Sequence, residues 1–171
     1  MSQRTIVITG GAGVLGQAVA RRASASGDRV VLLDRADIGE ATDLAGDLRI
    51  GGVDLTDPDS AGKAFTTIAE TCGGIDALLN IAGGFAWETL EDGAVDSWER
   101  MFAINLRTAV TASKTALPWL KSSGSGRIVN VGAAGAIKSD MGMGAYAASK
   151  AGVARLTESL SRELLGQVTV N

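Results

Sequence analysis

The feature that most constrains the fold of this sequence is a glycine-rich turn between a short apolar run and a helical pattern. The run Thr5–Thr9 is short and consists of β-branched residues, which predicts a strand, while the apolar residues of Val14–Ala25 recur with helical spacing. Between them lies Gly11-x-Gly13-x-x-Gly16. Glycines let such a turn close, let backbone N–H groups approach an anion, and let the helix pack tightly on the strand. The start of the chain therefore predicts a strand–turn–helix unit with an anion site.

The same alternation continues along the chain and predicts an α/β fold. Further strands are predicted at 30–34, 52–55, 77–81, 127–131 and 168–170, and helices at about 38–47, 58–72, 95–120 and 145–165. Asp57 followed by Pro58 is typical of a helix N-terminus. Right-handed crossovers pass over a sheet face, so this order predicts a doubly wound parallel sheet in three α/β/α layers, the Rossmann fold. Residues 1–171 are expected to form one domain.

Composition excludes several classes of function. The net charge of −3 provides no basic surface for nucleic acid or anionic lipid, and no apolar run is long enough for a membrane span. A single cysteine, Cys72, cannot form an internal disulfide, so a cytoplasmic location is expected. With no histidine and one cysteine, the usual zinc sites and the Ser-His-Asp and Cys-His groupings are excluded, and we expect no metal.

The glycine turn and the next strand together predict a dinucleotide site. Pyrophosphate is expected at the helix N-terminus, contacted by the turn residues Thr9, Gly10, Gly11, Gly13, Val14, Leu15 and Gly16. Asp34 follows Gly16 by about 18 residues, near the roughly 20 at which an acid meets ribose hydroxyls. A carboxylate there repels a 2′-phosphate and favours NAD(H), while Arg35 offers a counter-charge that keeps NADP(H) possible. Asp54 and Leu55 either contact the adenine or only begin the turn before Pro58.

A tyrosine and a lysine on the last predicted helix are the candidate catalytic pair. Tyr146 and Lys150 are four residues apart and so leave the same helix face. An adjacent ammonium favours the ionised form of a phenol, which suits acid–base chemistry. The same spacing also occurs where a tyrosine ring packs on a sheet and a lysine amine is exposed. The pair therefore indicates a catalytic site only in combination with the glycine turn.

Six segments make the sequence resemble the short-chain dehydrogenase/reductase family, in its simple, classical-like branch. They are TGGAGVLG (9–16), DLTD (54–57), NIAGG (80–84), INL (104–106), GRIVNV (126–131) and YAASK (146–150). The resemblance implies hydride transfer between the nicotinamide of NAD(H) and a small carbonyl, alcohol or quinonoid substrate. It assigns acid–base chemistry to Tyr146, ribose binding to Lys150 and support of Lys150 through a water to Asn105. It also implies that Asn80, Ala82 and Gly83 line the cofactor pocket, and that helices 95–120 and 145–165 form a homodimer or homotetramer.

The sequence departs from the family pattern in two places. The serine usually found thirteen residues before the tyrosine is Ala133 here, and losing one donor to an oxyanion typically costs about 10²–10³ in kcat. The dihydropteridine reductase branch also lacks that serine and has an Ala-Gly-Gly-aromatic segment like 82–85; Ser139 is a possible substitute donor. The chain also stops at Asn171, where the family continues into a substrate-covering helix and a further strand, so we expect a C-terminally incomplete fold.

Two other interpretations stay open at this point. Ala133 and the early end of the chain are consistent with a non-catalytic NAD-binding or assembly module. The glycine spacing also fits the extended branch of the family, whose members modify nucleotide sugars, although the NIAG segment favours the simpler oxidoreductases.

Overall fold

The computed structural model describes residues 3–38 and 44–171, and these contain one six-stranded parallel sheet. The strands are β1 (Thr5–Thr9), β2 (Arg29–Leu33), β3 (Leu48–Ile50), β4 (Ala77–Asn80), β5 (Gly126–Asn130) and β6 (Val168–Val170). Their order in the sheet is β3-β2-β1-β4-β5-β6, and every neighbouring pair is parallel. The chain reverses its direction of travel across the sheet between β1 and β4. This confirms the predicted doubly wound Rossmann fold.

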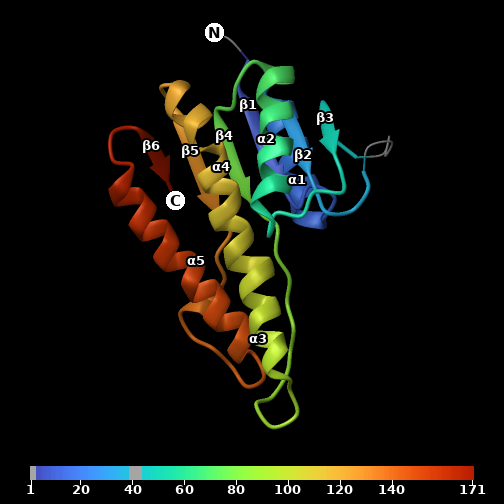
Figure 1. Ribbon diagram of the computed structural model, residues 1–171, viewed down its shortest axis with the longest axis vertical. Helices are drawn as coiled ribbons and strands as arrows, with labels where there is room; N and C mark the ends of the chain where they lie inside the picture. Colours follow the sequence, from blue (N-terminus) through green and yellow to red (C-terminus); the bar gives the residue numbers. More distant parts are fainter. Residues whose placement is uncertain (1–2, 39–43) are drawn as a thin grey trace.

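Helices cover both faces of the sheet. They are α1 (Val14–Ala25), α2 (Pro58–Cys72), α3 (Val95–Phe102), the π-helical turn η1 (Ala103–Arg107), α4 (Thr108–Ser122), the 3₁₀ helix η2 (Ala134–Ala136) and α5 (Gly144–Glu163). The larger core joins one sheet face to α2, α4 and the end of α5, and the smaller core joins the other face to α1. Figure 1 shows α2, α4 and α5 in front of the sheet. The predicted 95–120 helix is therefore three consecutive elements, interrupted by η1.

The region between β2 and α2 differs from its prediction. Residues 39–43 of the predicted 38–47 helix lie outside the described residues, and 44–47 are not helical. There the Ala45 N–H donates to the Gln17 side chain at 2.9 Å, and Asp47 accepts from the Val30 N–H at 2.7 Å. The third strand lies at Leu48–Ile50 rather than at the predicted 52–55. Gly52, with φ of +70°, ends the extended run before the predicted strand can begin.

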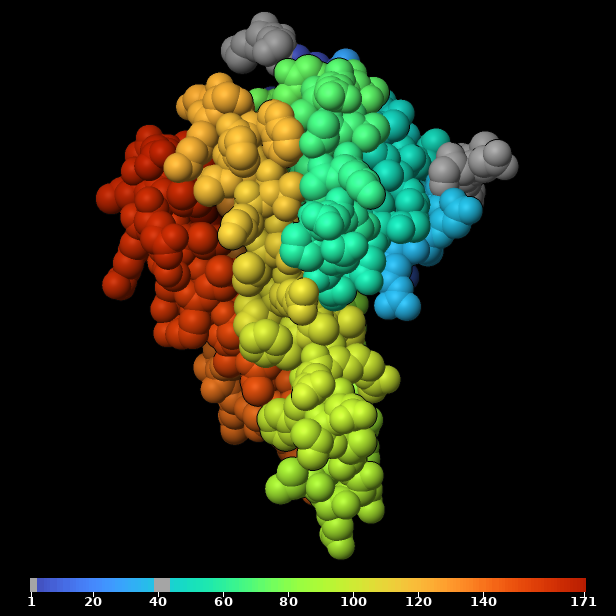
Figure 2. Space-filling view, in the orientation of Figure 1, coloured from blue at the N-terminus to red at the C-terminus, as the bar shows by residue number. Residues whose placement is uncertain are grey.

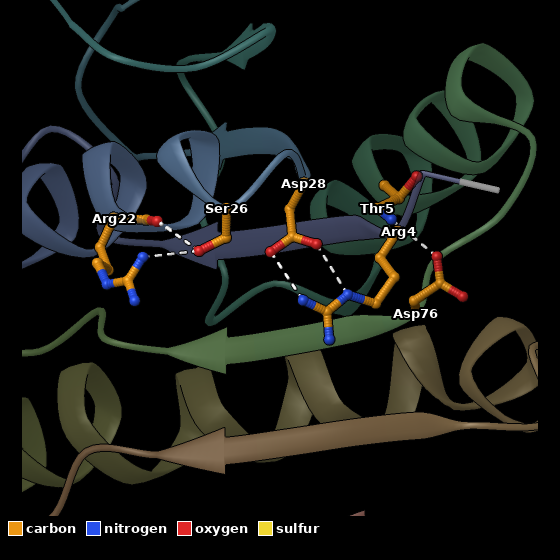
Figure 3. Close-up of polar contacts among 6 residues, drawn as sticks. All are labelled: Arg4, Thr5, Arg22, Ser26, Asp28 and Asp76. Atoms are coloured by element: carbon orange, nitrogen blue, oxygen red, sulfur yellow. Dashed lines mark hydrogen bonds and ion pairs between the residues drawn. The ribbon is translucent and has the colours of Figure 1, made fainter. Parts of the chain in front are cut away.

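Polar contacts secure the amino ends of the central strands, at the end of the sheet opposite the long connections. Arg4 pairs with both carboxylate oxygens of Asp28 at 2.8 and 2.9 Å, and the Thr5 N–H donates to Asp76 at 2.7 Å (Figure 3). These contacts tie the start of β1 to the turns that precede β2 and β4.

The connection from β4 to α3 extends beyond the carboxyl ends of the strands. It forms the narrow yellow-green end of the molecule together with α3, and the start of α5 lies beside it (Figures 1 and 2). The Glu88 N–H donates to the Gly142 carbonyl at 2.8 Å and so ties this connection to the loop that enters α5. Residues far apart in the sequence therefore meet at the carboxyl end of the sheet, where ligands bind in open α/β folds.

Candidate functional site

The glycine turn after β1 is built for a close approach of backbone to backbone and of backbone to ligand. Gly10 has φ of +66°, and a Cβ on it would lie 2.9 Å from the backbone of Ala82; a Cβ on Gly16 would collide with the Gly10 carbonyl oxygen. Gly13 caps α1 without a side-chain hydrogen bond. Within the described residues, no hydrogen bond uses the N–H groups of Val14 and Leu15 in the first turn of α1. The turn therefore offers free donors and the positive end of a helix dipole to an anion.

Asp34 follows β2 and contacts the same turn. Its two carboxylate oxygens accept from the N–H groups of Ala12 and Ala36, both at 2.9 Å. Gln17 holds the turn from the other side, since its side-chain amide donates to the Gly11 carbonyl at 2.6 Å. Each oxygen of Asp34 keeps a further lone pair, so the carboxylate can accept from ribose hydroxyls while it stabilises the turn.

A cleft of ≈ 650 Å³ runs along the carboxyl ends of the strands from this turn. Its lining comes from the turn, the strand ends and the π-helical region: Gly10, Ala12, Gly13, Val14, Leu15, Gly16, Asp34, Arg35, Val53, Asp54, Leu55, Thr56, Ile81, Ala82, Gly83, Ile104 and Thr108. The structure thus brings together most of the predicted cofactor contacts. Six lining residues were not predicted as cofactor contacts. Ala12, Val53, Thr56 and Ile81 are sequence neighbours of predicted contacts, whereas Ile104 and Thr108 come from the helical region, where they lie four residues apart and so share one helix face.

Three predicted cofactor contacts, Thr9, Gly11 and Asn80, lie beneath the cleft instead of lining it. The Thr9 hydroxyl accepts from the N–H groups of Ile81 and Ala82, both at 3.1 Å, and so joins the ends of β1 and β4. A Cβ on Gly11 would lie 2.7 Å from the Leu32 side chain. Asn80 is buried and donates to Ser113 and Asn130. These residues shape the floor of the cleft.

Asp54 begins the turn before Pro58, as one of its two interpretations predicts, and its contact with the adenine stays a prediction. It lines the cleft, and its carboxylate also accepts from the Thr56 hydroxyl at 2.7 Å and the Thr56 N–H at 2.8 Å. These hydrogen bonds, first the one from the hydroxyl, hold the pKa of Asp54 below its ordinary value. Asp54 is therefore an ionised acceptor that also begins the turn into α2.

Tyr146 and Lys150 lie one helical turn apart in α5, near the Gly83 end of the cleft. Lys150 is only 6% exposed, its ammonium donates to the Val131 carbonyl at 2.8 Å, and burial lowers its pKa. A Cβ on Gly83 would lie 3.7 Å from the Lys150 Nζ. The half-buried Tyr146 ring meets the Phe85 ring edge-to-face, with centroids 4.9 Å apart at 79°.

Asn105 projects from the π-helical turn η1 into the protein, where it is 1% exposed. Its side chain accepts from the Gly84 N–H at 2.9 Å, and it donates to the Gly84 carbonyl and the Ser149 hydroxyl, both at 3.0 Å. In the part of the chain that the structure describes, the side chain thus bonds the loop after β4 and α5, and no direct bond to Lys150 is found. Its support of Lys150 through a water stays a prediction.

Position 133 carries no hydroxyl, and the suggested substitute faces elsewhere. Ala133 is extended, with φ of −158° and ψ of 152°, immediately before η2. Ser139 is exposed, and its hydroxyl donates to the Asp140 carbonyl at 3.3 Å. Among residues 3–38 and 44–171, the Tyr146 hydroxyl has no hydrogen-bond partner, and no group of three histidine, cysteine or acidic residues could hold a metal ion. In the same residues, no helix is long and apolar enough to span a bilayer.

Comparison with known proteins gives one consistent family. Residues 4–171 match the family described as short chain dehydrogenase. D-beta-hydroxybutyrate dehydrogenase of Rhizobium meliloti (strain 1021) is 33% identical over 177 residues, which cover 98% of this chain and 69% of the relative. Meso-2,3-butanediol dehydrogenase of Serratia marcescens is 35% identical over 164 residues, which cover 92% of this chain and 64% of the relative.

Solved structures agree with these sequence relatives. The ligand-free aldohexose dehydrogenase of Thermoplasma acidophilum superposes with a TM-score of 0.91 at 29% identity, over 99% of this chain and 64% of that one. A xylitol dehydrogenase with bound NAD⁺ superposes with a TM-score of 0.91 at 27% identity, over 98% of this chain and 68% of that one. The chain thus spans 64% to 69% of the length of these four proteins.

Proposed function

The chain belongs to the short-chain dehydrogenase family, and from that premise we propose that it transfers hydride between NAD(H) and a small carbonyl or alcohol substrate, with Tyr146 as the acid–base group. The observation that carries this proposal is the course of the cleft. It begins at the glycine turn and Asp34 and ends at Gly83, beside the ammonium of Lys150. One ligand can therefore contact an anion site, a ribose acceptor and the catalytic pair.

The residues present fit a nicotinamide dinucleotide. Any side chain at Gly10 or Gly16 would fill the space inside the glycine turn, and the N–H groups of Val14 and Leu15 are available to a pyrophosphate. Asp34 accepts from ribose hydroxyls and repels a 2′-phosphate, which favours NAD(H) over NADP(H). When bound, the cofactor supplies the hydride donor or acceptor at its nicotinamide ring.

Lys150 and Tyr146 share the remaining chemistry. Lys150 uses one of its three N–H donors on Val131, so two donors are left for a ribose or for the phenol. The ammonium lies one helical turn from the phenol, on the same face of α5. Tyr146 then gives a proton to a carbonyl oxygen during reduction and removes the hydroxyl proton of an alcohol during oxidation.

The substrate class follows from the relatives and from Ala133. The relatives are named as dehydrogenases of a hydroxy acid and of a diol, so small secondary alcohols and their ketones are the first substrates to test. Ala133 favours an alternative, a quinonoid substrate whose reduction builds less charge on one oxygen. The same alanine supports a second candidate function, NAD binding without turnover.

Self-association is part of the proposal. Trp98 and Phe102 expose their rings on α3, beside a groove between α3 and α5 that Ala145 and Ala148 also line. Exposed aromatic side chains next to small residues suit a subunit contact. We therefore expect a homodimer or homotetramer through this face, measurable by sedimentation.

The test is an NADH-oxidation and NAD⁺-reduction screen over ketones, diols and quinonoid compounds, on this chain and on a C-terminally extended version. Tyr146→Phe should reduce turnover by at least about 10²-fold while NADH affinity is retained, because only the phenolic proton donor is removed. Wild-type rates in Tyr146→Phe would refute the proposed chemistry. NADH binding without turnover of any substrate would support the second function instead.

A further inference from the structure

We propose that Phe85 is a positioning residue that holds the phenol ring of Tyr146, at a site where Ala133 offers no hydroxyl to do so. The inference rests on the proposed function, in which Tyr146 is the acid–base group. It begins from one contact, since the two rings meet edge-to-face at 4.9 Å and 79°. Aromatic pairs prefer this geometry because the positive edge of one ring faces the negative face of the other.

Tyr146 needs such a contact because other restraints on its side chain are weak. Within the described residues, its hydroxyl has no hydrogen-bond partner. A Cβ added at Gly135 would be in van der Waals contact with the Tyr146 ring at 3.7 Å, so on this side the ring faces a residue that has no side chain. Phe85 itself is 57% exposed, so burial in the core does not account for its position. The ring contact joins the two side chains at a place where, within the described residues, no hydrogen bond restrains the phenol.

The backbone that carries Phe85 is fixed on its N-terminal side. The buried Asn105 bonds both the N–H and the carbonyl of Gly84, the residue immediately before Phe85. A Cβ on Gly84 would lie 2.7 Å from the Ile104 side chain, so the chain passes close to the π-helical turn. This clamp determines the direction in which Phe85 leaves the backbone.

The same loop is fixed on its C-terminal side. The Trp87 indole packs directly on Gly142, whose φ is +75°, and the Glu88 N–H donates to the Gly142 carbonyl at 2.8 Å. Phe85 therefore lies between two anchors, one on the π-helical turn and one on the loop that leads into α5. An exposed ring held at both sides can restrain its neighbour, whereas a ring on a free loop could not.

Asn105 also closes a ring of contacts that includes Tyr146. Its amide donates to the Ser149 hydroxyl at 3.0 Å, and that hydroxyl donates to the Tyr146 carbonyl at 2.7 Å. One buried side chain thus sets the backbone positions of Phe85, through Gly84, and of Tyr146, through Ser149. The relative position of the two aromatic rings follows from this closed path.

The expected consequence concerns turnover rather than cofactor binding. A ring edge can orient the phenol but supplies no proton, and the Phe85 side chain has no polar group that could bind a ribose or a phosphate. Loss of the contact should let the phenol leave its productive orientation for part of the time. We expect kcat to fall roughly 2- to 10-fold, the range that the strength of one aromatic pair implies, with NADH affinity unchanged.

The test uses the fact that Tyr146 is the only tyrosine of the chain. Ring-labelled tyrosine then gives a single set of NMR signals, which report on Tyr146 without any assay of activity. In Phe85→Leu these signals should move, because the ring current of Phe85 is lost, and kcat should fall. Phe85→Trp should keep kcat near the wild-type value and retain a ring-current shift. Leu165→Ala is the control for loss of an exposed apolar side chain, since Leu165 is 82% exposed and follows the far end of α5, and it should leave the Tyr146 signals unchanged.

Two results would overturn the inference. One is a set of Tyr146 signals in Phe85→Leu that coincides with the wild type, and the other is a shift of those signals with kcat unchanged. Failure of the proposed function looks different, because turnover that survives in Tyr146→Phe refutes the acid–base role whatever the NMR signals show.

Discussion

Asn105→Ala should lower the free energy of unfolding by about 3 kcal/mol. The side chain makes three hydrogen bonds to oxygen and nitrogen groups, two to the Gly84 backbone and one to Ser149, besides a long one of 3.9 Å to the Met101 sulfur, and each of the three contributes about 1 kcal/mol net. At 1% exposure, Asn105 is shielded from water that could replace these bonds. The half-buried Gly84 N–H and carbonyl would lose their partner, which places the cost between about 2 and 5 kcal/mol.

Urea unfolding with a global fit of the denaturant slope measures this cost. Asn105→Asp keeps the size of the side chain but places an acceptor opposite the Gly84 carbonyl, so it should destabilise at least as much as alanine. Thr108→Val is the control, because the Thr108 hydroxyl donates only to Ile104, in the turn just before it, and should cost less than about 1 kcal/mol. A cost below about 1 kcal/mol for Asn105→Ala, or wild-type stability for Asn105→Asp, would refute the reasoning.

Three further predictions concern Lys150, Asp34 and Ala133. Burial lowers the pKa of Lys150, so the charged form is penalised in the folded state and the free energy of unfolding falls as the pH drops below the ordinary lysine pKa. Lys150→Met should therefore be more stable than the wild type at pH 7, and this advantage should shrink towards pH 10.5 in thermal unfolding. An advantage that does not change with pH would contradict this prediction. Asp34→Ala should narrow the preference for NADH over NADPH by about 5-fold in fluorescence titrations, because charge repulsion of about 1 kcal/mol is removed, and an unchanged ratio would disprove the role. Ala133→Ser in a C-terminally extended enzyme should raise ketone turnover by up to about 10²-fold and leave quinonoid turnover almost unchanged; fast ketone turnover with Ala133 in place would count against it.

The parts of the fold that could be predicted are those set by local rules. The glycine turn, the Asp57 cap of α2 and the Tyr146–Lys150 spacing depend on residues within a few positions of one another. The Asp57 carboxylate accepts from the Asp59 N–H at 3.0 Å, as its place before Pro58 predicts. These features need no knowledge of the rest of the chain.

The region after β2 could not be predicted because its signals conflict. Val53 and Leu55 alternate with Asp54 as in a strand, and the structure does bury both apolar residues. The pairing with β2 is made earlier, by Leu48–Ile50, since Gly52 turns the chain away from the sheet. The period-2 pattern therefore reports burial correctly, but it assigns the hydrogen-bonded ladder to the wrong residues.

The hydrogen bonds of Asn105 could not be predicted from the sequence for a different reason. Asn105 bonds residues 21 and 44 positions away, and no local pattern indicates which partners a mid-helix amide will reach. The π-helical turn rotates the residues around it out of the regular helical phase, so a helical wheel drawn from 95 to 120 misplaces Asn105. The role that the resemblance assigns to Asn105 concerns Lys150, whereas its hydrogen bonds are to Gly84 and Ser149.

Hydrogen bonds contribute to the position of Tyr146 and Lys150, the proposed catalytic pair. The buried residues of α5 are Ala147, Ser149, Lys150 and Val153, which together offer little apolar surface. Directional bonds to three other parts of the fold supply what packing does not: Ser149 to Asn105, Lys150 to Val131, and Thr157 to Asn130 at 2.9 Å. A hydrogen bond fixes distance and angle, whereas small apolar side chains tolerate sliding. Loss of one of these bonds should therefore displace Tyr146 and Lys150 before it weakens the sheet, and turnover should be more sensitive than stability to Thr157→Val.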